Sequence, residues 1–206
     1  YNGLQIINRK VIIEYLQQLL KTDQRLAPFT LLGLEMKAYS DIIFTTDDGA
    51  ERRINIGGII DRLDMVTDTS TGKQTIRVVD YKTGHQPSSS IKNVEEIFEG
   101  NSSKHSDYYL QTLLYSLIVN KSSKLNPSRI SVSPALLFVK HTGNENYDPV
   151  LEIDAHKITD VGIYQAEYIK LLKEKLSEIF SKGKPFTPTT DIKKCETCTY
   201  RMLCGL

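Results

Sequence analysis

The sequence lacks several features that would assign it at once to a common class of protein. No stretch approaches the roughly 20 consecutive apolar residues that a membrane-spanning helix needs, so we expect no membrane partner. The N-terminal residues lack the pattern of a secretory signal peptide, which favours a cytoplasmic location. The net charge is only +1, so bulk charge does not indicate a nucleic-acid partner, and local sites must decide.

Several catalytic motifs are missing as well. The chain has no glycine-rich phosphate loop ending in Lys-Ser or Lys-Thr, and no arrangement typical of a nucleophilic serine or cysteine. A carbohydrate chemistry, or a phosphoryl chemistry that depends on such a loop, therefore has no positive support.

Cysteine is scarce and confined to one end of the chain. The three cysteines are Cys195, Cys198 and Cys204. An odd number at such tight spacing does not suit a disulfide framework, and clustered thiols in an intracellular chain indicate a metal. The Cys-x-x-Cys pair suits zinc or an iron–sulfur cluster, although three thiols leave a four-ligand site one short. The alternative is that these thiols bind no metal.

Hydrophobic periodicity and turn residues predict the order of the elements. We expect an amphipathic helix over 4–20, strands over 29–45, 51–66 and 74–82, a short helix near 94–98, a helix over 107–120, strands over 132–140 and 149–153, and a long amphipathic helix over 158–182. This order predicts an α/β domain over 1–190 with a mixed β-sheet flanked by helices, followed by a cysteine motif over 191–206.

The third predicted strand carries a carboxylate and a lysine on one face. Asp80 and Lys82 point the same way because side chains alternate along a strand, and Tyr81 points to the other face. In the strand before it, Asp61 lies among apolar residues on what we expect to be the core side. Arg62 and Asp64 point away from Asp61, and together we expect them to form a surface pair.

Clustered carboxylates favour a metal at this place. A short turn joins the two strands and brings Asp61 close to Asp80, and Glu35, in the first apolar strand, is a third candidate. Mg²⁺ prefers oxygen ligands and would relieve the repulsion among them. Lys82 could then orient water or stabilise charge on a phosphate. The plain alternative for Asp80 and Lys82 is a structural ion pair.

These residues stand in segments that resemble the PD-(D/E)XK nuclease superfamily, and most closely its RecB/AddB-type nuclease domains. The segments are GIIDRLD at 58–64, VVDYKTG at 78–84 and the Gln-x-x-x-Tyr motif at 111–115. Each is weak alone, but their order is specific, and the resemblance spans roughly residues 35 to 204. It implies a restriction-endonuclease-like fold and a Mg²⁺- or Mn²⁺-dependent deoxyribonuclease.

The resemblance also implies a role for each matching residue. Glu35, Asp61 and Asp80 would bind the metal together with the backbone carbonyl of Tyr81, and Lys82 would be the catalytic lysine. Gln111 and Tyr115 would share one face of their helix and position the lysine or the DNA. Their plain alternative is a buried, hydrogen-bonded pair within a core helix.

Two expected residues are missing. Many relatives carry a metal-site histidine on the first helix, but the histidines here are His85, His105, His141 and His156. The cysteines match three ligands of the [4Fe–4S] staple in AddB-type nucleases, whose fourth cysteine lies upstream. Because the chain begins at Tyr1 rather than at Met, we expect it to be a piece of a longer protein or a chain that lacks its first residues.

The resemblance leaves three readings of the whole protein open. The first is the exonuclease domain of a DNA-repair helicase–nuclease, in which a motor domain or subunit feeds it single-stranded DNA. The second is a stand-alone RecB-like nuclease of the CRISPR-adaptation type, which the long segment between residues 111 and 195 fits less well. The third is a catalytically silent DNA-binding or scaffold module of the same fold.

Overall fold

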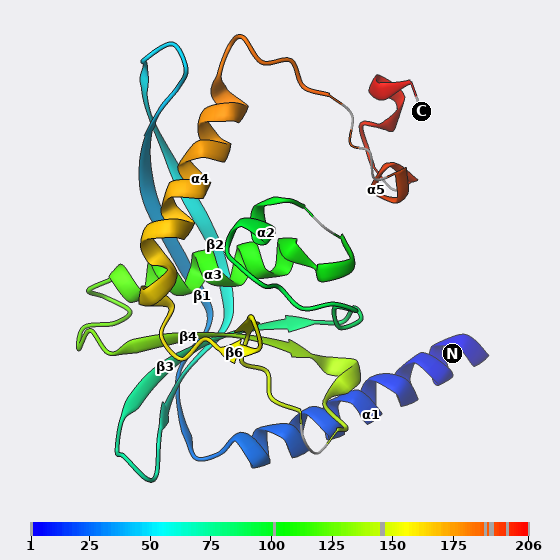
Figure 1. Ribbon diagram of the computed structural model, residues 1–206. Helices are drawn as coiled ribbons and strands as arrows, with labels where there is room; N and C mark the ends of the chain where they lie inside the picture. The colour runs from blue at the N-terminus through cyan, green and yellow to red at the C-terminus, as the bar shows by residue number, and fades with distance from the viewer. Residues whose placement is uncertain are drawn as a thin grey trace.

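A four-stranded mixed β-sheet forms the centre of the molecule (Figure 1). The computed structural model describes residues 2–100, 102–144, 147–187, 189, 192–196 and 198–205. The strands β1 (Phe29–Thr45), β2 (Glu51–Thr67) and β3 (Gln74–Lys82) form an antiparallel meander. The edge strand β4 (Ser131–Phe138) pairs with β3 in parallel. The first three strands confirm the boundaries predicted from the sequence to within one residue.

Helices cover both faces of the sheet. The helices α3 (Ser106–Lys121) and α4 (Gln165–Phe180) pack on one face and enclose the larger apolar core. The helix α1 (Gly3–Leu26) lies on the other face, where Leu19 packs against a smaller cluster of Val79, Ala135 and Leu137. Strand residues between these layers are therefore buried from both sides, which explains the apolar run of β4.

Short elements connect these layers. They are α2 (Glu95–Phe98), η1 (Ser102–Lys104), η2 (Val139–His141), β5 (Glu152–Ile153), β6 (His156–Lys157), η3 (Val161–Tyr164), α5 (Ile192–Glu196) and η4 (Arg201–Cys204). No helix in the described part of the chain is both long and apolar enough to cross a membrane.

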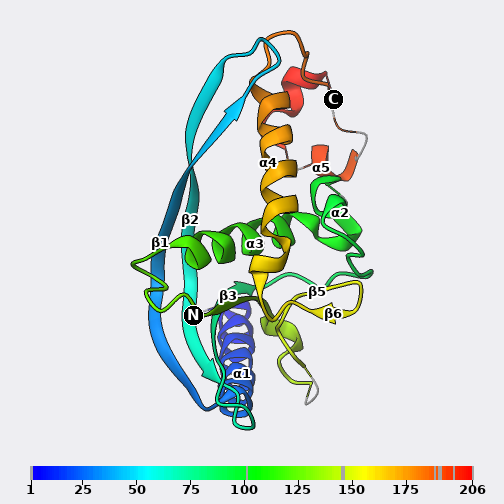
Figure 2. The ribbon, with the colours of Figure 1, turned by 60° about the vertical axis from the view of Figure 1, so that its left-hand side comes forward.

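The β1–β2 hairpin extends well beyond β3, and α4 lies along this extension (Figure 2). Phe44 of β1 contacts Phe180 of α4, with ring centroids 5.6 Å apart. The extension therefore has its own packing partner and does not depend on β3.

The structure corrects two predicted elements. The last long helix begins at Gln165 rather than at 158, because the Asp160 side chain accepts a hydrogen bond from the Gly162 amide at 2.9 Å and holds a separate 3₁₀ turn. The strand predicted at 149–153 is reduced to the two residues of β5 and an isolated bridge between Ala135 and Val150.

The apolar stripe predicted on the first helix is largely exposed. Ile12, Leu16 and Leu20 are 57%, 53% and 64% exposed, and the buried residue of α1 is Thr22. Thr22 donates a hydrogen bond to the carbonyl of Thr142 at 2.8 Å. The C-terminal part of α1 is thus held by polar contacts as well as by Leu19.

The prediction that Arg62 and Asp64 form a surface pair is wrong. The two residues do pair, at 3.0 Å, but they are only 4% and 0% exposed because α1 and Phe29 cover this face. Arg77 of β3 adds two hydrogen bonds to Asp64, at 3.0 and 3.1 Å. Asp23 of α1 accepts a 2.8 Å hydrogen bond from Arg62. We call Asp23, Arg62, Asp64 and Arg77 the buried charge network.

Candidate active site

The candidate site forms where β2 separates from β3. The pairing between these strands ends at Arg62 and Val79, whereas β3 continues beside β4 as far as Lys82. Beyond that end, the Asp61 side chain replaces the missing strand contact and accepts a hydrogen bond from the Tyr81 amide at 2.7 Å. The carboxylate of Asp61 is therefore fixed against the end of β3, beside Asp80.

Asp80 is a buried carboxylate with one cationic partner. Its side chain is 7% exposed, and its Oδ2 lies 2.7 Å from the Lys82 Nζ. Burial raises the pKa of Asp80 above its ordinary value, against the effect of Lys82, and the negative charge of Asp61 raises it further. Two carboxylates and one lysine leave this site with an excess of negative charge, which a divalent cation would neutralise.

Lys82 is held from three directions. Besides Asp80, its Nζ donates a 3.0 Å hydrogen bond to Oε1 of Gln111, and it lies 4.6 Å from the centroid of the Tyr108 ring. The Lys82 side chain is only 16% exposed. Its ammonium group is thus kept in one position, beside the two carboxylates.

Helix α3 supplies the groups that face Lys82. Nε2 of Gln111 donates a 3.3 Å hydrogen bond to the hydroxyl of Tyr115, one helical turn further on. The structure thus brings Gln111 and Tyr115 together with Asp61, Asp80 and Lys82. It also confirms that Asp80 and Lys82 share a face and that Tyr81 points to the other, where its hydroxyl accepts from Arg62 at 3.0 Å.

A glycine in β2 makes this approach possible. A Cβ atom on Gly58 would collide with the hydroxyl of Tyr115. Glycine at position 58 therefore leaves room for the Tyr115 side chain against the strand. The helix face that carries Gln111 and Tyr115 can therefore lie directly on the strand that carries Asp61.

Glu35 stands apart from the other predicted ligands. It lies in β1, in a gap of the β1–β2 pairing between Leu34–Arg62 and Met36–Ile60, and its φ of 50° departs from strand geometry. Its side chain is exposed. Within the described ranges, no group of three His, Cys, Asp or Glu side chains is arranged to hold a metal. The role of Glu35 as a ligand stays a prediction.

Tyr108 is the site residue that the sequence analysis missed. It lies three residues before Gln111 and hence on the same face of α3, where its ring meets Lys82. The helical spacing 108, 111, 115 was visible in the sequence. A tyrosine in a buried helix, however, is most often a core residue, and nothing in the sequence marks this one.

The three cysteines lie in the tail and form no disulfide. Cys195 is in α5 and Cys204 ends η4, while Cys198 and Cys204 are exposed. In the part of the chain that the structure describes, these thiols do not form a recognisable metal group. The iron–sulfur or zinc staple therefore has no support from the structure and stays a prediction. So does the domain boundary at 190 and 191, residues that lie outside the described part.

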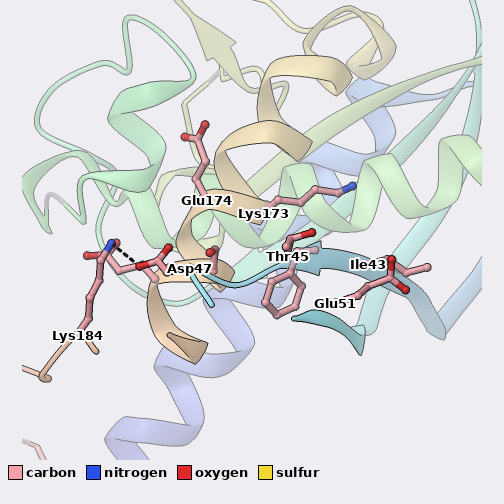
Figure 3. Close-up of a pocket in the computed structure, with 10 residues that line it drawn as sticks. Ile43, Thr45, Asp47, Glu51, Lys173, Glu174 and Lys184 are labelled. Atoms are coloured by element: carbon pink, nitrogen blue, oxygen red, sulfur yellow. Dashed lines mark ion pairs between the residues drawn. The ribbon is translucent and has the colours of Figure 1, made fainter. Parts of the chain in front are cut away.

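A separate hollow lies between the tip of the β1–β2 hairpin and α4 (Figure 3). Its charged lining comprises four carboxylates and two lysines, with Lys184 and Asp47 3.7 Å apart. Those residues are Asp47, Glu51, Lys173, Glu174, Glu178 and Lys184. None of the predicted site residues lines it, so the hollow is not the site described above.

The chain belongs to the PD-(D/E)XK nuclease superfamily, whose family model matches residues 2–205. The mixed α/β architecture, with helices on both faces of a four-stranded sheet, is consistent with the restriction-endonuclease-like fold. Membership implies a nuclease, that is, a hydrolase of phosphodiester bonds. No curated protein matches the chain significantly.

Proposed function

We propose that this chain is a Mg²⁺- or Mn²⁺-dependent deoxyribonuclease whose centre is formed by Asp61, Asp80 and Lys82. The observation that carries the proposal is the position of Lys82. Its ammonium group is fixed by Asp80 and Gln111 beside a second carboxylate, at the point where two strands separate. A merely structural ion pair would need neither Asp61 nor Gln111.

The residues present fit a divalent cation. Mg²⁺ is commonly bound through one or two carboxylates and keeps several waters. Asp61 and Asp80 are two such carboxylates, and the burial of Asp80 makes its charge costly without a cation. The backbone carbonyl of Tyr81 and the carboxylate of Glu35 are the further ligands that we propose. When bound, the cation polarises the phosphate and makes water a better nucleophile at neutral pH.

Lys82 supplies the positive charge that the reaction needs. In hydrolysis, water attacks phosphorus, one P–O bond breaks, and negative charge builds up on the phosphoryl oxygens. A held ammonium group can donate hydrogen bonds to those oxygens without reorganising. Gln111 accepts from Lys82 and donates to Tyr115, so it keeps the lysine oriented toward the substrate.

The test is cleavage of labelled single-stranded DNA by the purified chain, with Mg²⁺, with Mn²⁺ and with chelator. Lys82→Ala should reduce the cleavage rate by about 100-fold or more, the usual effect of removing a preorganised charge-stabilising donor. Lys173→Ala is the matched control, because Lys173 is exposed and lines the separate hollow. Its rate should equal that of the wild type.

Two results would overturn the proposal. One is cleavage that persists in Lys82→Ala, which would locate the chemistry elsewhere. The other is a folded wild-type chain that binds DNA but does not cleave it with either cation, which would favour the silent binding module.

We further propose that the domain acts as an exonuclease of the RecB/AddB type, supplied with single strands by a helicase domain or subunit. The contact of Gln111 with both Lys82 and Tyr115 supports this, because it gives the Gln-x-x-x-Tyr motif a role at the site. Linear and circular single-stranded DNA separate the possibilities. An exonuclease degrades the linear form and leaves the circle intact, whereas cleavage of the circle would show endonuclease action.

A further inference from the structure

A stack of two rings lies next to the catalytic lysine. The rings of His105 and Tyr108 are parallel, with an interplanar angle of 3° and centroids 4.6 Å apart. The Tyr108 ring is the one that the Lys82 Nζ approaches to 4.6 Å. The ammonium group of Lys82 therefore contacts the phenol ring of Tyr108, and that ring in turn contacts the imidazole of His105.

The position of Tyr108 is fixed on several sides. Its ring also contacts Phe138 at the end of β4, at a centroid distance of 6.1 Å. Its hydroxyl leaves little room beside Gly84, where a Cβ atom would lie 3.2 Å away. Because Tyr108 is held by β4, by Lys82 and by the segment after β3, it forms a rigid base for whatever stacks beside it.

His105 is held against Tyr108 at a backbone conformation that most residues avoid. Its φ is 46°, in the left-handed region, and it stands at the start of α3 without capping the helix through its side chain. Residues kept in this region cluster at binding sites, and the surrounding structure must enforce them. His105 is half-buried, so the residue is partly accessible to solvent.

We infer that His105 and Tyr108 form a nucleobase subsite, in which a base of the single-stranded substrate stacks on the imidazole of His105. Aromatic side chains beside a cationic contact to the backbone are the usual device for holding unpaired nucleotides, because every base has a flat π-face. A strand whose phosphate is bound at Lys82 would pass beside this stack. The inference rests on the proposed function and names the substrate feature that the site recognises.

Stacking on one aromatic side chain changes the affinity for a base by about 5- to 150-fold. We therefore expect the chain to bind a single-stranded oligonucleotide about tenfold more tightly than the same strand with abasic sugars in place of its bases. The binding is measured by fluorescence anisotropy in chelator, so that no cleavage takes place and the result does not depend on catalysis.

His105→Asn is the informative variant. Asparagine tolerates the left-handed backbone but has no ring, so the start of α3 is preserved. We expect His105→Asn to reduce the tenfold preference to about twofold or less, through weaker binding of the normal strand alone. Tyr39→Leu is the control, since Tyr39 is an exposed aromatic residue of β1, 52% exposed. It should keep the full preference.

The subsite is refuted if the wild type does not distinguish the two strands, or if His105→Asn weakens the binding of both equally. It is also refuted if Tyr39→Leu loses the preference to the same extent, because binding would then be unspecific. Absence of cleavage with either metal, together with an intact base preference, would overturn the proposed nuclease and leave the subsite standing.

Discussion

Two groups of charges arise from the same two strands and face opposite sides of the sheet. The buried charge network lies under α1 and joins two arginines to two aspartates. The candidate site lies under α3, where Lys82 pairs with Asp80 and Asp61 lies beside Asp80. In the network every carboxylate has an arginine within 3.1 Å, and Asp64 has two of them. In the site, Asp80 pairs with Lys82, whereas Asp61 accepts a hydrogen bond from the backbone amide of Tyr81 and has no arginine partner among the described residues.

The difference distinguishes a charge network that the fold completes from the candidate site, which the fold leaves undercompensated. A buried charge that is fully paired and hydrogen-bonded can remain ionised, whereas an undercompensated one is costly unless a ligand completes it. Asp64 is held by bonds that the folded chain itself provides. The pKa of Asp80 is raised by burial, so its negative charge is only partly compensated, and a divalent cation can compensate the rest. The alternation of strand side chains lets the two arrangements lie back to back.

Substitution in the buried charge network should have the largest effect on folding. Asp64→Asn keeps the size of the side chain but leaves Arg62 and Arg77 without their shared carboxylate. We expect a loss of about 3–5 kcal/mol in the free energy of unfolding, as is usual when one partner of a buried ion pair is removed. Urea denaturation monitored by circular dichroism measures it, and a loss below about 1 kcal/mol would contradict the role given to Asp64.

Substitution in the site should do the reverse. Asp80→Asn removes the undercompensated charge. We therefore expect the free energy of unfolding of the metal-free variant to lie within about 1 kcal/mol of the wild-type value, or slightly above it. Metal-dependent cleavage should fall by about 100-fold or more, because a proposed ligand to the cation is lost. Calorimetric titration with Mn²⁺ should show weaker binding as well. A strongly destabilised Asp80→Asn variant would contradict the proposed difference between the buried charge network and the candidate site.

A third variant sharpens the comparison at the contact between β2 and α3. Gly58→Ala places a methyl group against the hydroxyl of Tyr115, and we expect a loss of about 1–3 kcal/mol together with slower cleavage. Tyr115→Phe removes the opposing oxygen, so the double variant should recover part of the stability. Additive losses in the double variant would show that the two residues do not oppose each other.

The sequence predicted the face of the candidate site better than the opposite face. Alternation along β3 was enough to place Asp80 and Lys82 on one side and Tyr81 on the other. The family motif added Gln111 and Tyr115, although periodicity alone would have left them in the core. Arg62 and Asp64 were misplaced because charged side chains are expected to be exposed. Their burial depends on α1, which is distant in the sequence, and on Arg77, which lies opposite Asp64 on the neighbouring strand.

Two other features lay beyond reasoning from the sequence. The start of α4 was misplaced because the helical pattern continues through 158–164, where the Asp160 turn prevails. The stack on Tyr108 depends on His105 adopting a left-handed backbone, which no pattern of residue types announces. Both features depend on local hydrogen bonding or tertiary contacts rather than on periodicity.

The smallest predicted effect concerns the dependence of stability on pH. Because the pKa of Asp80 is raised in the folded chain, the folded state binds this proton more tightly than the unfolded state does. Its contribution to the free energy of unfolding is therefore present at low pH and lost as pH rises from the ordinary value through the raised pKa. Asp80→Asn should remove that loss, measured by urea denaturation in chelator between about pH 2 and pH 7.

Asp68 provides a control of opposite sign. Hydrogen bonds from Ser70 and Thr71 lower its pKa to about 2, so its contribution is present above the ordinary pKa and is lost as pH falls. Asp68→Asn should therefore reduce the loss in the free energy of unfolding at acidic pH. Asp80→Asn should instead raise the free energy of unfolding near neutral pH relative to its value at acidic pH. Both variants could instead change the slope of the free energy of unfolding against pH in the same direction. That result would mean that the charge of Asp80 is as well compensated in the metal-free chain as that of Asp64. The contrast between the two faces would then have to rest on activity alone.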